Sequence, residues 1–279
     1  MAAAAVLRPV LPDLFLQRVG RFAVQSNTQV YVFRLGDTLI DTGSPNQWPA
    51  VRAFVAATTA ARPGRTPPRR ALVTHHHEDH AGNGARLQRE LGVPVAVPPL
   101  TAPLVREDMV QEYYRRIIWG RYEPFEPQGG VLAEEEALPE LGPGVALRVV
   151  HAPGHIGDHH CFHLPSRGWL FTADLFVARR RMYYRKDEDA SVELDSLRRV
   201  LQLDFDTLLC SHRGVVPDGK AALAERVAFM EEVRARTREL RARGLPPAAI
   251  RKQLLGAEGL MRYLTMHDFS KQRFIDTIA

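Results

Sequence analysis

A segment of six residues, His75 to His80, contains four potential metal ligands in the pattern His-x-His-x-Asp-His. Neutral imidazoles and a carboxylate suit a borderline divalent metal such as zinc. In an extended loop His75 and His77 can point the same way, because alternate side chains share a face. Asp79 and His80 must then turn toward a second position, so one loop can serve two metal ions. The alternative is an accidental histidine cluster in a solvated loop.

Three further candidate ligands each follow or end an apolar run. Buried strands have this composition, and open α/β sheets bind ligands at the carboxyl ends of their strands. Three candidates in the same context favour one shared site over three separate structural roles. They are His155 after residues 145–150, Asp174 at the end of residues 169–174, and His212 after residues 207–211.

Together with Asp41 in the segment Leu-Ile-Asp-Thr-Gly, these residues resemble the metallo-β-lactamase fold superfamily over roughly residues 20–218. The resemblance is specific for the superfamily and only weakly specific for the substrate. It implies an α/β fold, a four-layer αβ/βα sandwich with metals at one edge of two packed sheets.

The resemblance also implies a role for each candidate residue. Asp174 would bridge two metals, and Asp41 would orient a ligand rather than bind metal, although a turn in Asp-Thr-Gly explains it equally well. His76 points away by alternation, and a structural or supporting role is expected for His159, His160 and His163. The implied ligands are His75, His77 and His155 for the first metal, and Asp79, His80 and His212 for the second.

A carboxylate at position 174 resembles glyoxalase II (hydroxyacylglutathione hydrolase), lactonases and nucleases, whereas β-lactamases usually have another residue there. The stretch after Asp174 resembles the thioester-binding stretch of glyoxalase II. Where that family has a lysine this chain has Met182 among arginines, which favours another anionic acyl thioester, such as a coenzyme A ester, over glutathione. The candidate substrate-binding residues are Arg179, Arg181, Tyr183, Tyr184 and Arg213, with a solvent-exposed loop as the alternative for the arginines.

The ligand set predicts a metal-dependent hydrolase, thioesterase- or esterase-like, in which a metal-bridging hydroxide attacks a small acyl thioester or ester. Asp79 or Asp174 would pass a proton to the leaving group. Zinc is the expected metal, with iron or manganese as alternatives. A ribonuclease, a lactonase and a one-iron dioxygenase of the same fold remain open. So does a non-catalytic metal-binding interaction module, which the complete ligand set disfavours.

Composition narrows the partners. The net charge of +5 favours a small anionic substrate, and nucleic acid is the less favoured partner, although a generally arginine-rich composition explains the charge equally well. No apolar stretch is long enough to span a bilayer, and residues 1–8 lack the features of a signal peptide. The two cysteines have no CxxC partner, which favours the cytoplasm.

The chain is expected to divide into a catalytic domain, residues 1–218, and a helical C-terminal extension, residues 219–279. Residues 101–130 form an insert, with a helix expected at 107–118 and the aromatic residues Trp119, Tyr122 and Phe125 after it. The aromatic cluster is a pocket wall, core packing or a homodimer contact. The patterns elsewhere predict a hairpin at 30–33 and 38–40, helices at 49–61 and 82–91, a strand at 93–97, and helices at 220–243, 248–255 and 268–278.

Overall fold

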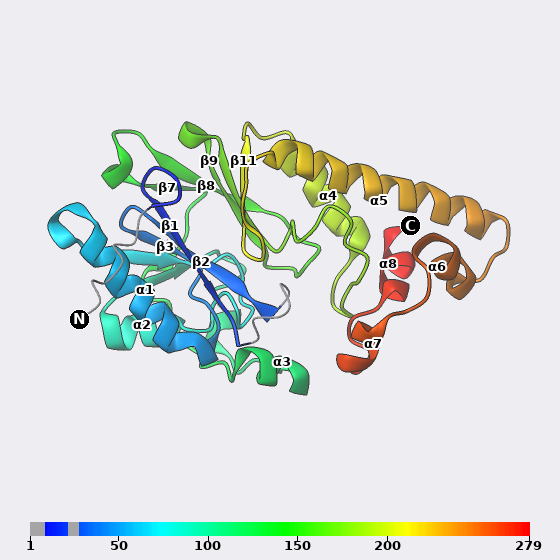
Figure 1. Cartoon of the computed structure of the whole chain (residues 1–279), viewed down its shortest axis with the longest axis horizontal. Helices are drawn as coiled ribbons and strands as arrows, with labels where there is room; N and C mark the ends of the chain where they lie inside the picture. Colours follow the sequence, from blue (N-terminus) through cyan, green and yellow to red (C-terminus); the bar gives the residue numbers. More distant parts are fainter. Residues whose placement is uncertain (1–8, 22–27) are drawn as a thin grey trace, which may run out of the picture.

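Two six-stranded β-sheets pack face to face in the computed structural model, which describes residues 9–21 and 28–279 (Figure 1). The first sheet is antiparallel from β1 to β3 and parallel from β3 to β6. Its strands, in spatial order, are β1 (Leu14–Val19), β2 (Val30–Leu35), β3 (Thr38–Ile40), β4 (Arg70–Leu72), β5 (Val95–Val97) and β6 (Gly130–Val131).

In the second sheet β10 and β11 are parallel, and the other neighbouring strands are antiparallel. Its spatial order is β12 (Gly214–Val216), β11 (Thr207–Cys210), β10 (Trp169–Ala173), β9 (His160–Leu164), β8 (Ala146–His151) and β7 (Glu135–Ala137). The predicted hairpin is β2 and β3, and the predicted strand 93–97 is the shorter β5.

Side chains alternate between the two faces of each strand, so each sheet contributes to one core between the sheets and to one core on its outer face. Between the sheets, Phe33 meets Phe171 edge to face with ring centroids 5.5 Å apart. Outside the first sheet pack α1 (Trp48–Ala61) and α2 (Gly84–Leu91), and outside the second pack α4 (Ala190–Leu201) and α5 (Gly219–Ala242). The expected four-layer sandwich is therefore confirmed.

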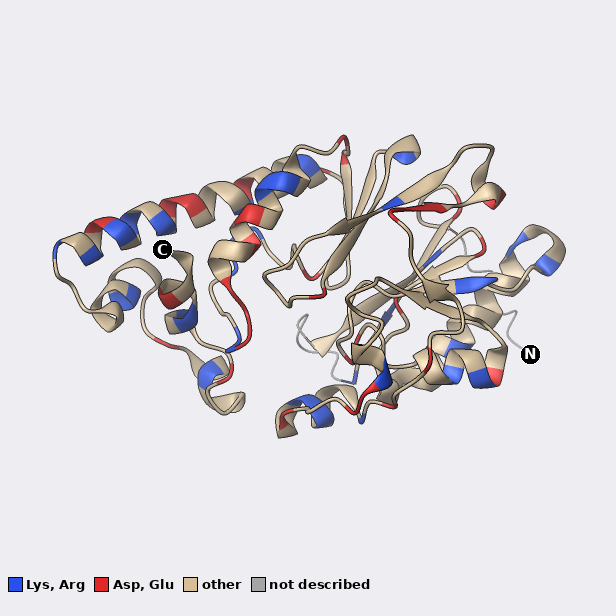
Figure 2. Cartoon of the chain, turned by 180° about the vertical axis from the view of Figure 1, so that it is seen from behind, with Lys and Arg blue, Asp and Glu red and all other residues tan. Residues whose placement is uncertain are grey.

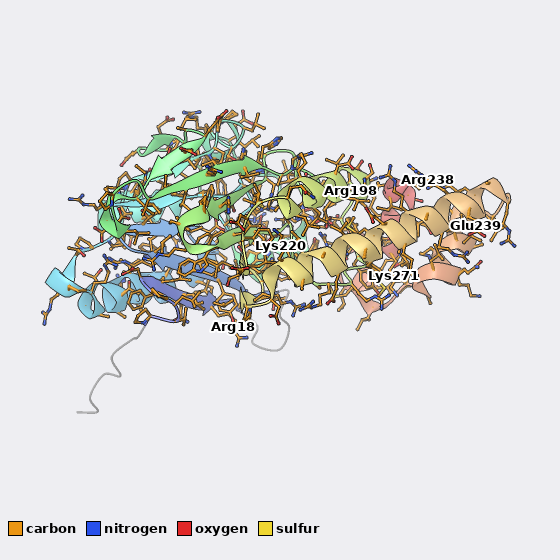
Figure 3. The ribbon with its side chains drawn as sticks, turned by 90° about the horizontal axis from the view of Figure 1, so that it is seen from above. Arg18, Arg198, Lys220, Arg238, Glu239 and Lys271 are labelled. Atoms are coloured by element: carbon orange, nitrogen blue, oxygen red, sulfur yellow. The ribbon has the colours of Figure 1, made fainter. Side chains whose placement is uncertain are left out.

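The C-terminal residues after β12 are helical. Figure 3 shows α5 running from Lys220, beside the sheets, to Arg238 and Glu239 at its far end. Acidic and basic residues are interspersed along α5 (Figure 2), so its arginines form a mixed-charge surface. The helices α6 (Pro247–Leu255), α7 (Leu260–Leu264) and α8 (Lys271–Ile278) follow; α7 was not predicted, and α8 begins at 271 because the Ser270 hydroxyl caps it.

The predicted helix at 107–118 is wrong in extent, because α3 spans only Tyr113–Trp119. The Gln111 side chain donates to the Gly120 carbonyl and accepts from the Tyr122 amide, so residues before α3 run irregularly, and Val110 is 97% exposed. Tyr122 and Phe125 are buried in the core of the first sheet, as the packing alternative expected.

No helix among residues 9–21 and 28–279 combines the length and the apolar character that a bilayer crossing requires. The expectation for residues 1–8 lies outside the described residues.

Candidate metal centre

The histidine-rich loop begins after β4 and ends before α2, at the carboxyl edge of the first sheet. Asp41 follows β3 on the neighbouring strand, in the left-handed region with φ 59°. Its Oδ1 accepts from the Thr74 backbone amide at 2.9 Å, and its Oδ2 lies 2.7 Å from His80 Nδ1. Asp41 therefore fixes the start of the loop through Thr74 and orients the candidate ligand His80.

The candidate ligands converge on two adjacent positions. At the first, His77 Nδ1 lies 3.0 Å from both His75 Nε2 and His155 Nε2, and His155 Nε2 lies 3.2 Å from Asp174 Oδ2. At the second, Asp174 Oδ1 lies 3.3 Å from His80 Nε2 and 3.1 Å from His212 Nε2. Each group could hold a metal ion, and Asp174 belongs to both. The groups are His75, His77, His155 and Asp174, and Asp79, His80, Asp174 and His212.

Four of the five histidines are fixed from outside through Nδ1. An outer partner that occupies Nδ1 leaves the Nε2 lone pair facing inward, the form in which imidazole binds metal. The partners of Nδ1 are Thr74 Oγ1 for His75 (3.1 Å), Asp41 Oδ2 for His80 (2.7 Å), Glu188 Oε1 for His155 (2.6 Å) and the Gln29 carbonyl for His212 (2.7 Å).

Electrostatics divides the cluster into neutral and charged groups. Burial lowers the pKa of His75 and His77 well below the usual value, so both imidazoles are neutral. Burial would raise the pKa of Asp174, but the surrounding histidines, His212 first, outweigh it and hold that pKa well below its usual range. Neutral His75 and His77 and an ionised Asp174 are in the state that divalent metals bind. Burial would lower the pKa of His80, but Asp41 and Asp174 raise it above its usual value, so His80 has to release a proton when metal binds.

The donor geometry fits a metal. His80 Nε2 and Asp174 Oδ1 are buried, and neither has a hydrogen-bond partner among the described residues. Leaving such atoms unpaired is costly, and a shared cation would satisfy both. A tetrahedral zinc site with bonds of about 2.0–2.1 Å separates its ligand atoms by about 3.3 Å. The donor separations of 3.0–3.3 Å are close to that spacing.

Glu188, which the sequence analysis missed, lies behind His155. It lies in the loop that joins β10 to α4 and is fully buried. It accepts from His155 Nδ1 at 2.6 Å, from the Arg185 amide at 2.8 Å and from the Arg181 guanidinium. Burial alone would raise the pKa of Glu188, but Arg181 and His155 hold it well below its usual range. In the sequence, Glu188 is marked only as an acidic residue in a charged segment just before Asp189, the N-cap of α4. This pattern does not indicate a partner for His155.

The Glu188 contact extends into a buried ion-pair network. Arg181 also contacts Glu193 of α4 at 3.5 Å, and Glu193 accepts from Arg226 of α5 at 2.9 Å. Glu188, Glu193 and Arg226 are buried and the Arg181 side chain is 11% exposed, so solvent screens these charges little. The network links one metal-ligand candidate to the helices outside the second sheet.

Further contacts support the two ligand loops. Glu78 is fully buried and binds Arg115 of α3, with Oε1 2.6 Å from Nε. His76 turns away and binds Asp158 at 2.8 Å, as alternation predicted. His159 Nε2 accepts from the Asp174 amide at 3.1 Å, a supporting contact of the expected kind. The rings of His160 and His163 contact the backbone carbonyls of Asp158 and Asp204.

A cavity of about 500 Å³ opens beside the two ligand groups. Among the predicted substrate residues, Arg181, Tyr183 and Arg213 line it. Arg179 and Tyr184 do not: Arg179 pairs with Glu225 of α5 at 2.7 Å, and Tyr184 is fully buried and stacks on Phe274 of α8. Both side chains therefore contact the C-terminal helices instead of the cavity. The spacing of residues in the sequence does not indicate these contacts.

Comparisons with known proteins agree with this geometry. An atrochrysone carboxyl ACP thioesterase of Aspergillus aculeatus is 26% identical over 225 residues, 80% of this chain and 62% of that protein. A hydroxyacylglutathione hydrolase of Edwardsiella ictaluri is 30% identical over 151 residues, 52% of this chain and 48% of that protein. The chain thus spans about half to three-fifths of the length of these relatives.

Two solved structures share the fold over nearly the whole chain. A metallo-beta-lactamase family protein from Thermus thermophilus aligns with a TM-score of 0.65 at 21% identity, covering 96% of this chain and 91% of that one. A beta-lactamase domain protein from Burkholderia ambifaria aligns with a TM-score of 0.67 at 19% identity, covering 98% and 90%. The family model of the metallo-beta-lactamase superfamily matches residues 22–212, which include both ligand groups. The chain belongs to the metallo-beta-lactamase superfamily.

Proposed function

We propose that this chain is a dinuclear zinc hydrolase that cleaves acyl thioesters with an anionic carrier. The observation that carries the proposal is the position of Asp174, which belongs to both ligand groups and lies at the wall of the cavity. Both kinds of named relative, the hydroxyacylglutathione hydrolases and the ACP thioesterases, act on thioesters by name, which supports this bond type over the alternatives.

The reaction consumes one water, breaks the acyl C–S bond, and releases a carboxylic acid and a thiol. Two divalent metals in these groups would lower the pKa of bound water and polarise the thioester carbonyl. Burial raises the pKa of Asp79, and Asp174 and Glu78 raise it further against the pull of His80. Asp79 also lies at the cavity wall, and we propose that it passes a proton to the leaving thiolate.

The charge distribution favours a small substrate over a nucleic acid. Arg115, Arg181 and Arg185 line the cavity, but each is already paired with a carboxylate of the chain. Arg180 and Arg213 also line the cavity and are exposed, and Arg213 Nε donates to the Val177 carbonyl at 2.8 Å. We propose that these two guanidinium groups contact a phosphate or carboxylate of the carrier. A polyanion would need a continuous row of cations available to it.

The two cysteines support a reducing compartment, which we propose to be the cytoplasm. Cys161 and Cys210 are both free and buried. Burial raises the pKa of the Cys210 thiol to about 12, so it is protonated and unreactive at neutral pH.

The test is thiol release from coenzyme A, glutathione and acyl carrier protein thioesters by zinc-loaded protein. We expect His77→Ala to abolish turnover and to lower bound zinc, measured by elemental analysis. The neighbouring His76→Ala should retain both, because His76 faces Asp158 rather than the ligand groups. Turnover of RNA or lactones but not of thioesters would refute the proposal, and steep salt dependence would identify the nuclease.

A further inference from the structure

One part of the cavity is not explained by thioester chemistry. Beyond the metal-ligand candidates its wall is largely apolar. The apolar side chains come from three separate segments: Ile117 and Trp119 of α3, Val177 and Met182 after β10, and Met261 and Leu264 of α7. A metal centre that acted only on short polar acyl groups would have no use for such a wall.

Trp119 and Met182 also contact the two outer cores, but Leu264 and Ile117 belong to neither. Leu264 is 56% exposed and Ile117 is 40% exposed. Figure 1 and Figure 2 show α3 and α7 near each other along the lower edge of the molecule, and residues of both line one cavity. Apolar surface that faces a cavity from two sides marks a binding surface rather than ordinary surface scatter.

The arginines that line the cavity differ in their pairing and exposure. Inside, Arg115 is neutralised by Glu78, and Arg181 by Glu188. The exposed arginines of the cavity are Arg180 and Arg213. The cavity thus combines the metal-ligand groups, internally paired arginines and two exposed arginines with a set of apolar side chains.

We propose that the apolar wall binds the acyl group of the substrate, and that the enzyme selects medium-length apolar acyl chains over short ones. This inference rests on the proposed thioesterase function and adds the substrate class to it. The thioester carbonyl lies at the metal-ligand groups, the chain extends between α3 and α7, and the anionic carrier contacts Arg180 and Arg213. Leu264 is then a specificity-determining residue supplied by the C-terminal helices.

The experiment compares kcat/KM for acetyl-, butyryl- and octanoyl-coenzyme A in the wild type and two variants. Each buried methylene is worth about 0.8 kcal/mol, or roughly a fourfold gain. We expect kcat/KM to rise at least ~100-fold from acetyl to octanoyl. Leu264→Asp should lower the octanoyl value at least ~10-fold and the acetyl value by a smaller factor, because it places a charge on the apolar wall.

Leu260→Asp is the matched control. Leu260 lies on the same helix and is 70% exposed, but it is not among the residues that line the cavity. This variant should retain the chain-length profile. A flat or falling profile with measurable turnover would overturn the acyl-chain inference and leave the thioesterase proposal standing.

A binding measurement keeps the two proposals separable. Isothermal titration calorimetry with the thioethers S-octyl- and S-ethyl-coenzyme A needs no catalysis and no metal. The apolar site is supported if the octyl thioether binds more tightly than the ethyl thioether and this difference is lost in Leu264→Asp. If this holds while no thioester is hydrolysed, only the thioesterase proposal fails. Equal affinities for the two thioethers would refute the site.

Discussion

Replacement of Glu188 by glutamine tests whether this buried carboxylate positions the metal centre. The substitution keeps the shape of the side chain and removes its charge. Glu188 accepts from His155 Nδ1 at 2.6 Å and from the Arg185 amide at 2.8 Å. Because the carboxylate orients the imidazole and increases its basicity, zinc should bind more weakly in Glu188→Gln.

Two magnitudes follow from the contacts. Loss of the carboxylate behind a ligating histidine lowers metal affinity by roughly 10- to 100-fold, or about 1.4–2.8 kcal/mol. Folding stability falls as well, because a buried charge partner of Arg181 is lost. Breaking a buried pair costs about 3–5 kcal/mol. Arg181 keeps its contact with Glu193 at 3.5 Å, so we expect the lower end of that range.

Chelator competition measures zinc affinity, and urea unfolding of the metal-free protein measures stability. Glu193→Gln is the matched control, because Glu193 is equally buried and contacts Arg181 and Arg226 but does not contact His155. The control should lose comparable stability and retain zinc affinity. If both variants weaken zinc binding equally, or if Glu188→Gln binds zinc as tightly as the wild type, the positioning role is refuted.

Three other results are expected. Removal of metal by a chelator should lower the Tm, and added zinc should restore it. A ligand at 100 times its Kd stabilises the folded protein by about 2.7 kcal/mol, so an unchanged Tm would contradict the metal centre. Asp41→Asn should weaken zinc binding roughly 10- to 100-fold by chelator competition, since His80 Nδ1 loses its carboxylate; unchanged affinity would count against this role. Glu258 accepts from the backbone amides of Lys271 and Gln272, and although partial burial raises its pKa, the Ser270 hydrogen bond and these amides lower it overall. Its contribution to stability is therefore present above the usual Glu pKa of about 4.3 and lost as pH falls below it. Glu258→Gln should flatten urea-unfolding stability in that acidic range, and identical profiles would refute the assignment.

The candidate ligands were accessible to sequence analysis because their signal is local. His75 to His80 lie on one loop, and Asp174 directly follows a strand whose apolar run ends there. His155 and His212 follow strands of the same sheet, so recognition of the strands placed all of them at one edge. The family resemblance implied the division of these donors into two groups that share Asp174, and the structure brings together the same two groups.

The sequence by itself identified the residues that gather at the edge of the sheets, because ligand spacing and apolar strand runs are encoded over short stretches of chain. The resemblance of that ligand pattern to a known superfamily implied the layered sandwich. Only the tertiary structure decided what surrounds that edge. Glu188 became the partner of His155, and Leu264 became part of a cavity wall, through packing of the C-terminal helices. Contacts between segments distant in the chain depend on how helices dock, and docking leaves no periodic signal in the sequence.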